Sequence, residues 1–274
     1  MPSAALIGVP WEDHSSYLRG AAGAPRAIRA ALRSPSSNPS TESGFDLGSD
    51  SRFSDAGDVA IPEGDEALPA IESGIGKLLD SGARVLSLGG DHAITYPVVR
   101  AHAARHPGLT LVHFDAHPDL YDEYEGDRLS HACPFARIME QGLATRLVQI
   151  GIRTLNAPQR AQIERFGVEV IAMKDFRPDL VVEAAGPVYV TVDLDGLDPA
   201  YAPGVSHPEP GGLSTRDVIG VVQRLRGQVV GADVVELNPT CDPDGTTARV
   251  AAKIAKELVA RLMCDPDPSS REGA

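Results

Sequence analysis

The sequence predicts an α/β protein in which helices flank a parallel β-sheet. Short apolar runs alternate along the chain with longer stretches of helical periodicity, and about eight of the short runs are expected to be strands. Two of them, VYVTVD at 188–193 and GADVVEL at 231–237, are almost continuously apolar. Such runs are typical of strands buried on both faces of a parallel sheet.

The first half of the chain begins this alternation. Residues 4–8 are predicted to form a strand, and residues 24–32 a helix with Pro25 in its first turn, where proline is favoured. Residues 34–50 are rich in Ser, Pro and Asn, which predicts a surface loop rather than a domain linker. The other elements expected here are strands within 52–59, at 84–88 and at 109–115, and helices at 65–80 and 95–105.

The second half continues without a fixed-period repeat or a break in composition, so we expect a single domain over residues 1–274. The expected strands lie at 146–152, 168–172, 188–193 and 229–237, and the expected helices at 131–141, 158–166, 214–225 and 246–263. The last ten residues contain proline, serine and acidic side chains and are expected to form a frayed tail.

The charge balance argues against several classes of partner. The 274 residues include 25 Lys and Arg against 38 Asp and Glu, a formal net charge of −13. Nucleic acids and anionic membranes attract basic surfaces, so we expect neither as a partner. No apolar run approaches the length of a membrane span, and the N-terminus lacks the pattern of a signal peptide. The three cysteines form no C-x-x-C pair, which favours reduced thiols and a cytoplasmic location.

Ionisable side chains collect where the predicted strands end. Asp91 and His92 follow the strand at 84–88, and DAHPD at 115–119, DLDGLD at 193–198 and ELNP at 236–239 end three further strands. In open parallel sheets the ligand crevice lies outside the carboxyl ends of the strands. We therefore expect these clusters to meet there, although they are far apart in the sequence.

The donor types in these clusters predict a site for two metal ions. The six donors are His92, Asp115, His117, Asp119, Asp193 and Asp195. Their four carboxylates would repel one another unless cations lay among them. Oxygen and imidazole donors without cysteine suit Mn²⁺, Fe²⁺ or Co²⁺ better than a structural zinc site, Ca²⁺ or Mg²⁺. Six ligands fit two ions bridged by carboxylates, which would acidify a shared water.

Each cluster taken alone has a plainer interpretation. Asp91 or Asp198 could cap a helix or a turn. His113 lies within an apolar strand and is expected to be a core histidine. Cys133 has no basic neighbour in the sequence that would activate it, so a small buried apolar residue is expected there. Metal binding is favoured because three clusters occur at three strand ends.

These motifs resemble those of the ureohydrolase family, which comprises arginases, agmatinases and related amidinohydrolases. The matching segments are GGDH at 89–92, DAHPD at 115–119, SHACPF at 130–135, DLDGLDP at 193–199 and VELNP at 235–239. The likeness extends from about residue 6 to residue 262. Within the family, the segments at 8–25, 115–140 and 202–213 most resemble plant-type arginases and their bacterial agmatinase-like relatives.

The resemblance implies a three-layer α/β/α sandwich on an eight-stranded parallel sheet, with two Mn²⁺ ions per chain and Co²⁺ or Fe²⁺ as alternatives. It assigns one ion to His92 and Asp119 and the other to His117 and Asp195. It makes Asp115 and Asp193 the bridging ligands. Because relatives form trimers or hexamers, a homo-oligomer is also implied.

The reaction that the resemblance implies is hydrolysis of a guanidinium group to urea and an amine. Glu236 matches the family's guanidinium-binding carboxylate, to which a planar cation can donate two parallel hydrogen bonds. His131 matches the histidine that relays protons, a task suited to its near-neutral pKa. With these two residues, the metal ligand Asp119 completes the predicted catalytic set.

The sequence departs from animal-type arginases where the rest of the substrate would be recognised. The loop whose Asn and Ser contact the substrate carboxylate in those enzymes is replaced by the acidic segment 120–128. Asn156 stands at the place of an aspartate, and His207 at the place of a threonine. The segment 120–128, Asn156 and His207 are all candidates for the wall that recognises the substrate, and each could equally be ordinary loop chemistry.

The predicted function is hydrolysis of L-arginine or agmatine, an activity of arginine metabolism or polyamine biosynthesis, with a slight preference for arginase. N-hydroxyarginine, guanidinobutyrate and formimidoylglutamate are alternative substrates. A metal-binding relative without activity is the non-enzymatic alternative, and the complete ligand set, His131 and Glu236 argue against it.

Overall fold

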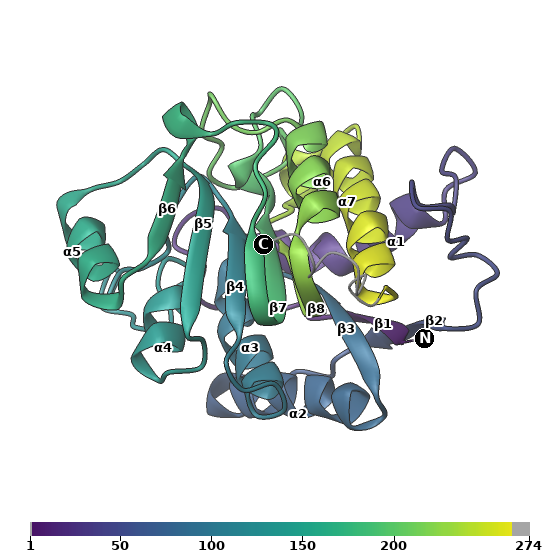
Figure 1. Cartoon of the computed structure of the whole chain (residues 1–274), viewed down its shortest axis with the longest axis horizontal. Coiled ribbons are helices and arrows are strands. Elements are labelled where there is room, and N and C mark those ends of the chain that lie inside the picture. The colour runs from purple at the N-terminus through teal and green to yellow at the C-terminus, as the bar shows by residue number, and fades with distance from the viewer. Residues whose placement is uncertain (1, 265–274) are drawn as a thin grey trace.

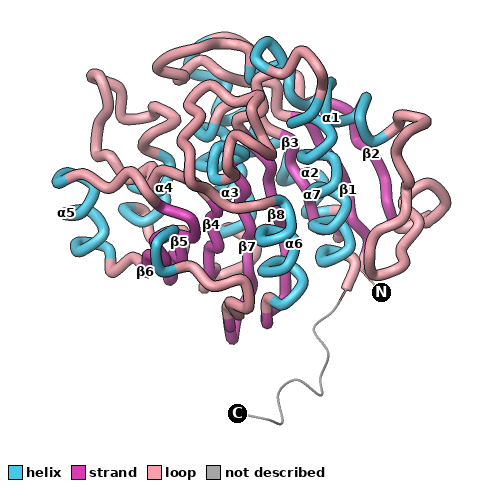
Figure 2. The backbone as a smooth tube through the Cα atoms, turned by 90° about the horizontal axis from the view of Figure 1, so that it is seen from above, coloured by secondary structure: helices cyan, strands magenta, loops and turns pink. Residues whose placement is uncertain are grey.

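The computed structural model describes residues 2–264, so the tail predicted for the last ten residues lies outside the described residues. Within them, eight strands form one sheet in the order β2-β1-β3-β8-β7-β4-β5-β6, and every neighbouring pair is parallel. Figure 2 shows the strands side by side in this order. Their bounds are β1 Ser3–Gly8, β2 Phe53–Asp58, β3 Ala83–Leu88, β4 Thr110–Phe114, β5 Arg146–Ile152, β6 Glu169–Ala172, β7 Glu183–Asp193 and β8 Arg226–Val235.

Helices cover both faces of the sheet and confirm the predicted three-layer sandwich (Figure 1). One face is covered by α1 (Ala24–Leu32), α6 (Thr215–Arg224) and α7 (Thr246–Leu262), whose apolar side chains share a core with the sheet. On the other face lie α2 (Ala67–Asp80), α3 (Thr95–Ala103) and α4 (Pro134–Glu140), with α5 (Ala157–Phe166) beside α4. No described helix combines the length and the apolar character needed to cross a membrane.

All eight predicted strands are present, and the differences from the prediction lie at element ends. β7 begins at Glu183 rather than at residue 188, because Glu183 pairs with Arg226 of β8 across a register shift. β8 ends at Val235, two residues before its predicted end, which leaves Glu236 beyond the strand. α4 begins at Pro134, not at residue 131, because proline is favoured in the first turn of a helix and disfavoured in its interior. His131 therefore lies in the loop before α4.

The strand order places the chemical clusters on four neighbouring strands. β3, β8, β7 and β4 are adjacent at the centre of the sheet, and all four point in the same direction. Two glycines let the segments after β3 and β7 approach their neighbours closely, Gly90 the segment after β1 and Gly196 the segment after β4. A Cβ atom on Gly90 would lie 1.8 Å from the Trp11 carbonyl oxygen, and one on Gly196 would lie 2.8 Å from the Asp115 backbone. The turn after β7 can therefore pack directly on the turn after β4.

Candidate metal centre

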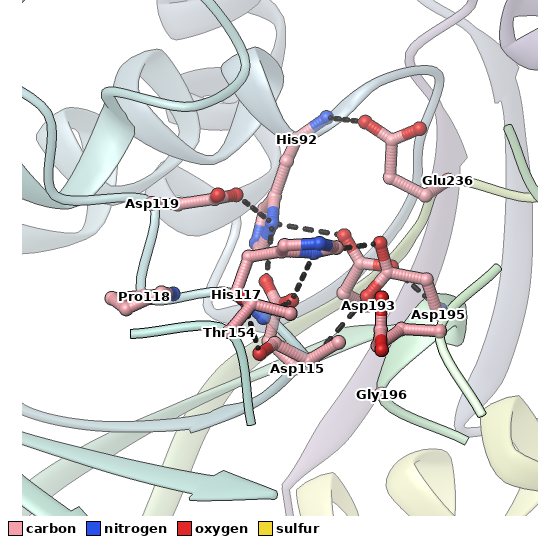
Figure 3. Close-up of polar contacts among 12 residues, drawn as sticks. His92, Asp115, His117, Pro118, Asp119, Thr154, Asp193, Asp195, Gly196 and Glu236 are labelled. Carbon is pink, nitrogen blue, oxygen red and sulfur yellow. Dashed lines mark hydrogen bonds and ion pairs between the residues drawn. The ribbon is translucent and has the colours of Figure 1, made fainter. Parts of the chain in front are cut away.

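Three of the four central strands, β3, β4 and β7, deliver the six predicted donors to one crevice, as Figure 3 shows. His92 opens a short 3-10 helix after β3, and Asp91 caps that helix by accepting the N–H of Ala93. Asp115, His117 and Asp119 lie in the loop after β4, while Asp193 ends β7 and Asp195 follows in the next turn. His92 and Asp193, which are 101 positions apart in the chain, are thereby brought into contact.

The first group of donors surrounds Nδ1 of His92. This nitrogen lies 3.2 Å from Oδ2 of Asp115, 2.9 Å from Oδ2 of Asp119 and 3.1 Å from Oδ2 of Asp193. All four side chains are buried. Three carboxylate oxygens and one ring nitrogen thus converge on a common point, an arrangement suited to a single divalent cation.

The second group consists of Asp115, His117 and Asp195. Nδ1 of His117 lies 3.1 Å from Oδ2 of Asp195 and 3.4 Å from Oδ1 of Asp115. Asp115 therefore directs one oxygen to each group, an arrangement that supports its predicted bridging role. Asp193 belongs to the first group, and its Oδ1 accepts the backbone N–H of Asp195 at 2.7 Å, so its bridging role stays a prediction.

The electrostatics of the cluster fit a pair of divalent cations. Burial raises the pKa of Asp195 to about 7 and that of Asp193 well above its usual value, and neighbouring carboxylates add to both shifts. Burial alone would lower the pKa of His92, but the three carboxylates close to its Nδ1 hold it well above its usual value. Nδ1 of His92 nevertheless has no hydrogen bond of good geometry. Four buried carboxylates with two imidazoles are the donor set that Mn²⁺ accepts.

His113 is buried, as the sequence predicted, but it also contacts a ligand. Its Nε2 lies 2.7 Å from Oδ2 of Asp115, and its Nδ1 lies 3.1 Å from Nε2 of Gln149. Gln149 in turn donates to the Pro118 carbonyl in the loop that carries His117 and Asp119. The sequence carried a signal for this contact: His113 and Asp115 both lie in the predicted strand at 109–115, and alternate residues of a strand share a face.

The plainer interpretations hold for three other residues. Asp91 caps a turn and also accepts a hydrogen bond from Ser15, and Asp198 accepts the N–H groups of Ala200 and Gly211. Cys133 is fully buried, and burial raises the pKa of its thiol to about 12. None of these three lines the cavity described next.

A cavity of about 210 Å³ opens over the donor cluster. Glu236 lies at its edge with a φ of 65°, a left-handed conformation that is rare for residues other than glycine. Its Oε1 accepts the backbone N–H of His92 at 2.9 Å and Nδ1–H of His131 at 3.0 Å. Burial alone would raise the pKa of Glu236, but His131 lowers it; Glu236 in turn brings the pKa of His131 to about 9 against the effect of burial. The two residues therefore form a charged pair.

Several cavity residues were missed by sequence reasoning. Nε2 of His131 lies 2.8 Å from the Ser16 hydroxyl, which comes from the loop after β1. Of the other lining residues, Tyr121 and Tyr124 belong to the candidate segment 120–128, whereas Ala132, Thr154 and Gln159 were not predicted. Their residue types are common in loops, and no local pattern distinguishes them from surface residues.

The two candidate specificity residues differ in position. His207 lines the cavity, and its ring centre lies 5.2 Å from that of His131. Asn156 does not line it: its side chain caps α5 by accepting the N–H of Gln159 and donates to the Tyr121 hydroxyl. Any influence of Asn156 on a substrate would therefore act through Tyr121 or Gln159.

Comparisons with known proteins agree with this geometry. A sequence profile of the arginase family matches residues 2–260. Arginase 1, mitochondrial, from Arabidopsis thaliana is 47% identical over 277 aligned residues, which cover 95% of this chain and 81% of that protein. Guanidinopropionase from Pseudomonas aeruginosa is 40% identical and covers 94% of this chain and 86% of its own length. The first name refers to mitochondria, whereas the cytoplasmic location predicted for this chain stays a prediction.

Among solved structures, arginase from Medicago truncatula superposes with a TM-score of 0.90 at 44% sequence identity. The match covers 95% of this chain and 87% of the other. The eight-stranded parallel sheet with helices on both faces is therefore the arrangement shared with that protein.

Proposed function

The chain belongs to the arginase family, and we propose that it is a binuclear manganese enzyme that hydrolyses L-arginine or agmatine to urea and an amine. Its membership identifies it as an arginase-type hydrolase of linear amidines with a buried His/Asp metal-ligand cluster. The proposal rests above all on one observation: the six donors, His131 and Glu236 lie around the same cavity or directly beneath it.

The proposed ligand assignment follows the two donor groups. His92, Asp115, Asp119 and Asp193 would hold one ion, and Asp115, His117 and Asp195 the other. When bound, two divalent cations supply Lewis acidity and lower the pKa of a coordinated water towards neutrality. Like Glu236, Asp119 has a left-handed backbone conformation, with a φ of 49°. We propose that Asp119 belongs to the catalytic set together with His131 and Glu236.

Glu236 is proposed to orient the guanidinium group. Its Oε1 is engaged by His92 and His131, whereas its Oε2 has no partner among the described residues and remains available to a cation. A guanidinium that donates to this carboxylate would be held in the cavity directly beside the metal ligands. Planar recognition of this kind fixes the orientation of the reacting carbon, which is a large part of the catalytic effect.

His131 is proposed to deliver a proton to the departing amine. With a pKa of about 9, it stays protonated at neutral pH, and the proton it can give up is the one on Nε2, since Nδ1–H donates to Glu236. Ser16, at 2.8 Å from Nε2, holds the ring on the side opposite to Glu236. The side chain is thus oriented at both nitrogens, as efficient proton transfer requires.

The remaining cavity wall contains no lysine or arginine among the described residues. The tail of a substrate would therefore meet the hydroxyls of Ser16, Tyr121, Tyr124 and Thr154, the amide of Gln159 and the ring of His207, whose pKa burial lowers. Such groups can accept from an ammonium and donate to a carboxylate. Arginase is preferred over agmatinase because of the identity to the plant enzyme, and the 40% identity to guanidinopropionase makes a guanidino acid the second candidate.

A urea-release assay on a panel of guanidines tests the proposal. After loading with Mn²⁺, we expect turnover of L-arginine or agmatine, with weaker turnover of guanidinopropionate and guanidinobutyrate and none of N-acetylated amines. Urea release from none of the guanidines, despite two bound ions per chain, would contradict the proposed activity. We also propose one catalytic domain over the whole chain and a homo-oligomer, which light scattering of the purified protein tests.

A further inference from the structure

The ring of His92 is contacted, on the side away from the carboxylates, by a hydroxyl that belongs neither to the donor groups nor to the cavity wall. Nε2 of His92 lies 3.1 Å from Oγ1 of Thr191, and both side chains are fully buried. Nδ1 is the nitrogen that faces the three carboxylates. An imidazole that coordinates through Nδ1 carries its proton on Nε2, so Nε2–H would donate to Thr191.

Beyond Thr191 lies Asp233, a carboxylate with no exposed surface. Thr191 of β7 and Asp233 of β8 are register partners, so both side chains point to the same face of the sheet. Oδ2 of Asp233 accepts hydrogen bonds from the Tyr189 hydroxyl at 2.7 Å and from the Thr95 hydroxyl at 2.9 Å. Burial raises the pKa of Asp233, while His92 and the hydroxyls of Thr191, Tyr189 and Thr95 oppose that shift.

A buried carboxylate in this position lowers the stability of the fold, so a purely structural role does not account for it. No lysine or arginine of the described chain lies within ion-pair distance of it, and its Oδ1 has no hydrogen bond of good geometry. An unpaired buried charge is destabilising unless something compensates for it. Its electrostatic partner in the core is the ring of His92, one hydroxyl away.

We propose that Thr191 and Asp233 are positioning residues that fix the orientation and tautomer of His92 for metal binding. Thr191 accepts Nε2–H of the ring, and the negative charge of Asp233 lies behind it, so the Nδ1 lone pair points into the first donor group. Metal-binding histidines commonly depend on such outer partners, and losing one typically weakens metal affinity about 10- to 100-fold. The inference deepens the proposed function and predicts an effect on one of the two ions.

The test compares Mn²⁺ binding by the apoprotein, followed through the electron paramagnetic resonance signal of free Mn²⁺. Thr191→Val removes the hydroxyl and keeps the β-branched shape, and we expect one of the two ions to bind about 10-fold or more weakly. Thr191→Ser restores a hydroxyl and should recover the wild-type affinity. Asp233→Asn, if it folds, should weaken the same ion as Thr191→Val.

Thr95→Val is the matched control, because the Thr95 hydroxyl donates to the same carboxylate but makes no hydrogen bond to the ring of His92. It should lower the thermal unfolding midpoint and leave both Mn²⁺ affinities unchanged. Wild-type affinities in Thr191→Val, or an equal loss in Thr95→Val, would overturn the inference. These readouts do not depend on turnover: a wild-type protein that binds two ions but releases no urea would contradict the proposed function and leave this test intact.

Discussion

Replacement of Glu236 by glutamine is the sharpest test of how the cavity recognises a guanidinium group. The carboxylate is 4% exposed and accepts from the His92 backbone and from His131, with Oε2 left for the substrate. In Glu236→Gln the amide oxygen would remain with the two donors of the protein, which turns the –NH₂ group towards the cavity. An N–H donor would then face the N–H donors of the guanidinium.

The expected loss follows from the contacts removed. A hydrogen bond to a charged group contributes about 1.5–3 kcal/mol, and every 1.36 kcal/mol corresponds to about a factor of ten in rate. Loss of the charged contact to the substrate should therefore lower kcat/KM about 10- to 100-fold. His131 supplies a second readout: without the carboxylate, its pKa should fall from about 9, and the basic limb of the rate profile should move to lower pH.

The assay is steady-state urea release after Mn²⁺ loading, with metal content measured on the same sample. Asp242→Asn is the control for loss of a buried carboxylate, since Asp242 accepts the N–H groups of Thr247 and Ala248 at the start of α7 and does not line the cavity. It should cost about 1 kcal/mol of stability and leave kcat/KM unchanged. Wild-type kcat/KM in a fully loaded Glu236→Gln would refute the binding role.

Three further predictions concern the same crevice. Asp115→Ala removes the residue that directs one oxygen to each donor group. Metal analysis of this variant should find fewer than two ions per chain, and the urea assay should detect no turnover. Two retained ions would count against the proposed site. Because the pKa of His131 is raised to about 9, its protonated form persists at neutral pH and is lost as the pH rises through 9, so kcat/KM should fall above that pH. His131→Asn should lower kcat about 10²-fold or more and lose this basic limb, and an unchanged limb would exclude His131 as its source. Ser16→Ala should lower kcat more than it changes KM, because it frees one side of the His131 ring; an effect confined to KM would make Ser16 a substrate contact instead.

The fold and the donor set could be predicted because their signals are local. A buried parallel strand is recognisable by its continuous apolar run, and the residues that follow it must lie at the same end of the sheet. Asp115 and Asp193 could thus be placed together although they are 78 positions apart. The ends of elements were less certain: residues 183–187 include Gly186 and Pro187, which do not favour a strand, yet they extend β7 because β8 offers a partner.

The cavity wall could not be predicted because its signals are not local. Ser16 reaches His131 only because the loop after β1 folds over the crevice, where the backbone N–H of His131 donates to the His14 carbonyl. Asn156 is a good helix cap by sequence, and the structure uses it as one. A position that matches a substrate contact in a relative can therefore serve the scaffold instead, and only the arrangement of Tyr121 and Gln159 around it shows which.

The buried charges also explain how the crevice can exist before metal arrives. The raised pKa values of Asp193, Asp195 and His92 mean that, without cations, protons occupy part of the cluster and reduce the repulsion among its carboxylates. Divalent cations must displace those protons, because only deprotonated donors coordinate. Since the pKa of Asp195 lies at about 7, this competition falls in the neutral range, and metal affinity should weaken as the pH drops below it. The same burial that brings the donors together thus couples metal uptake to proton release.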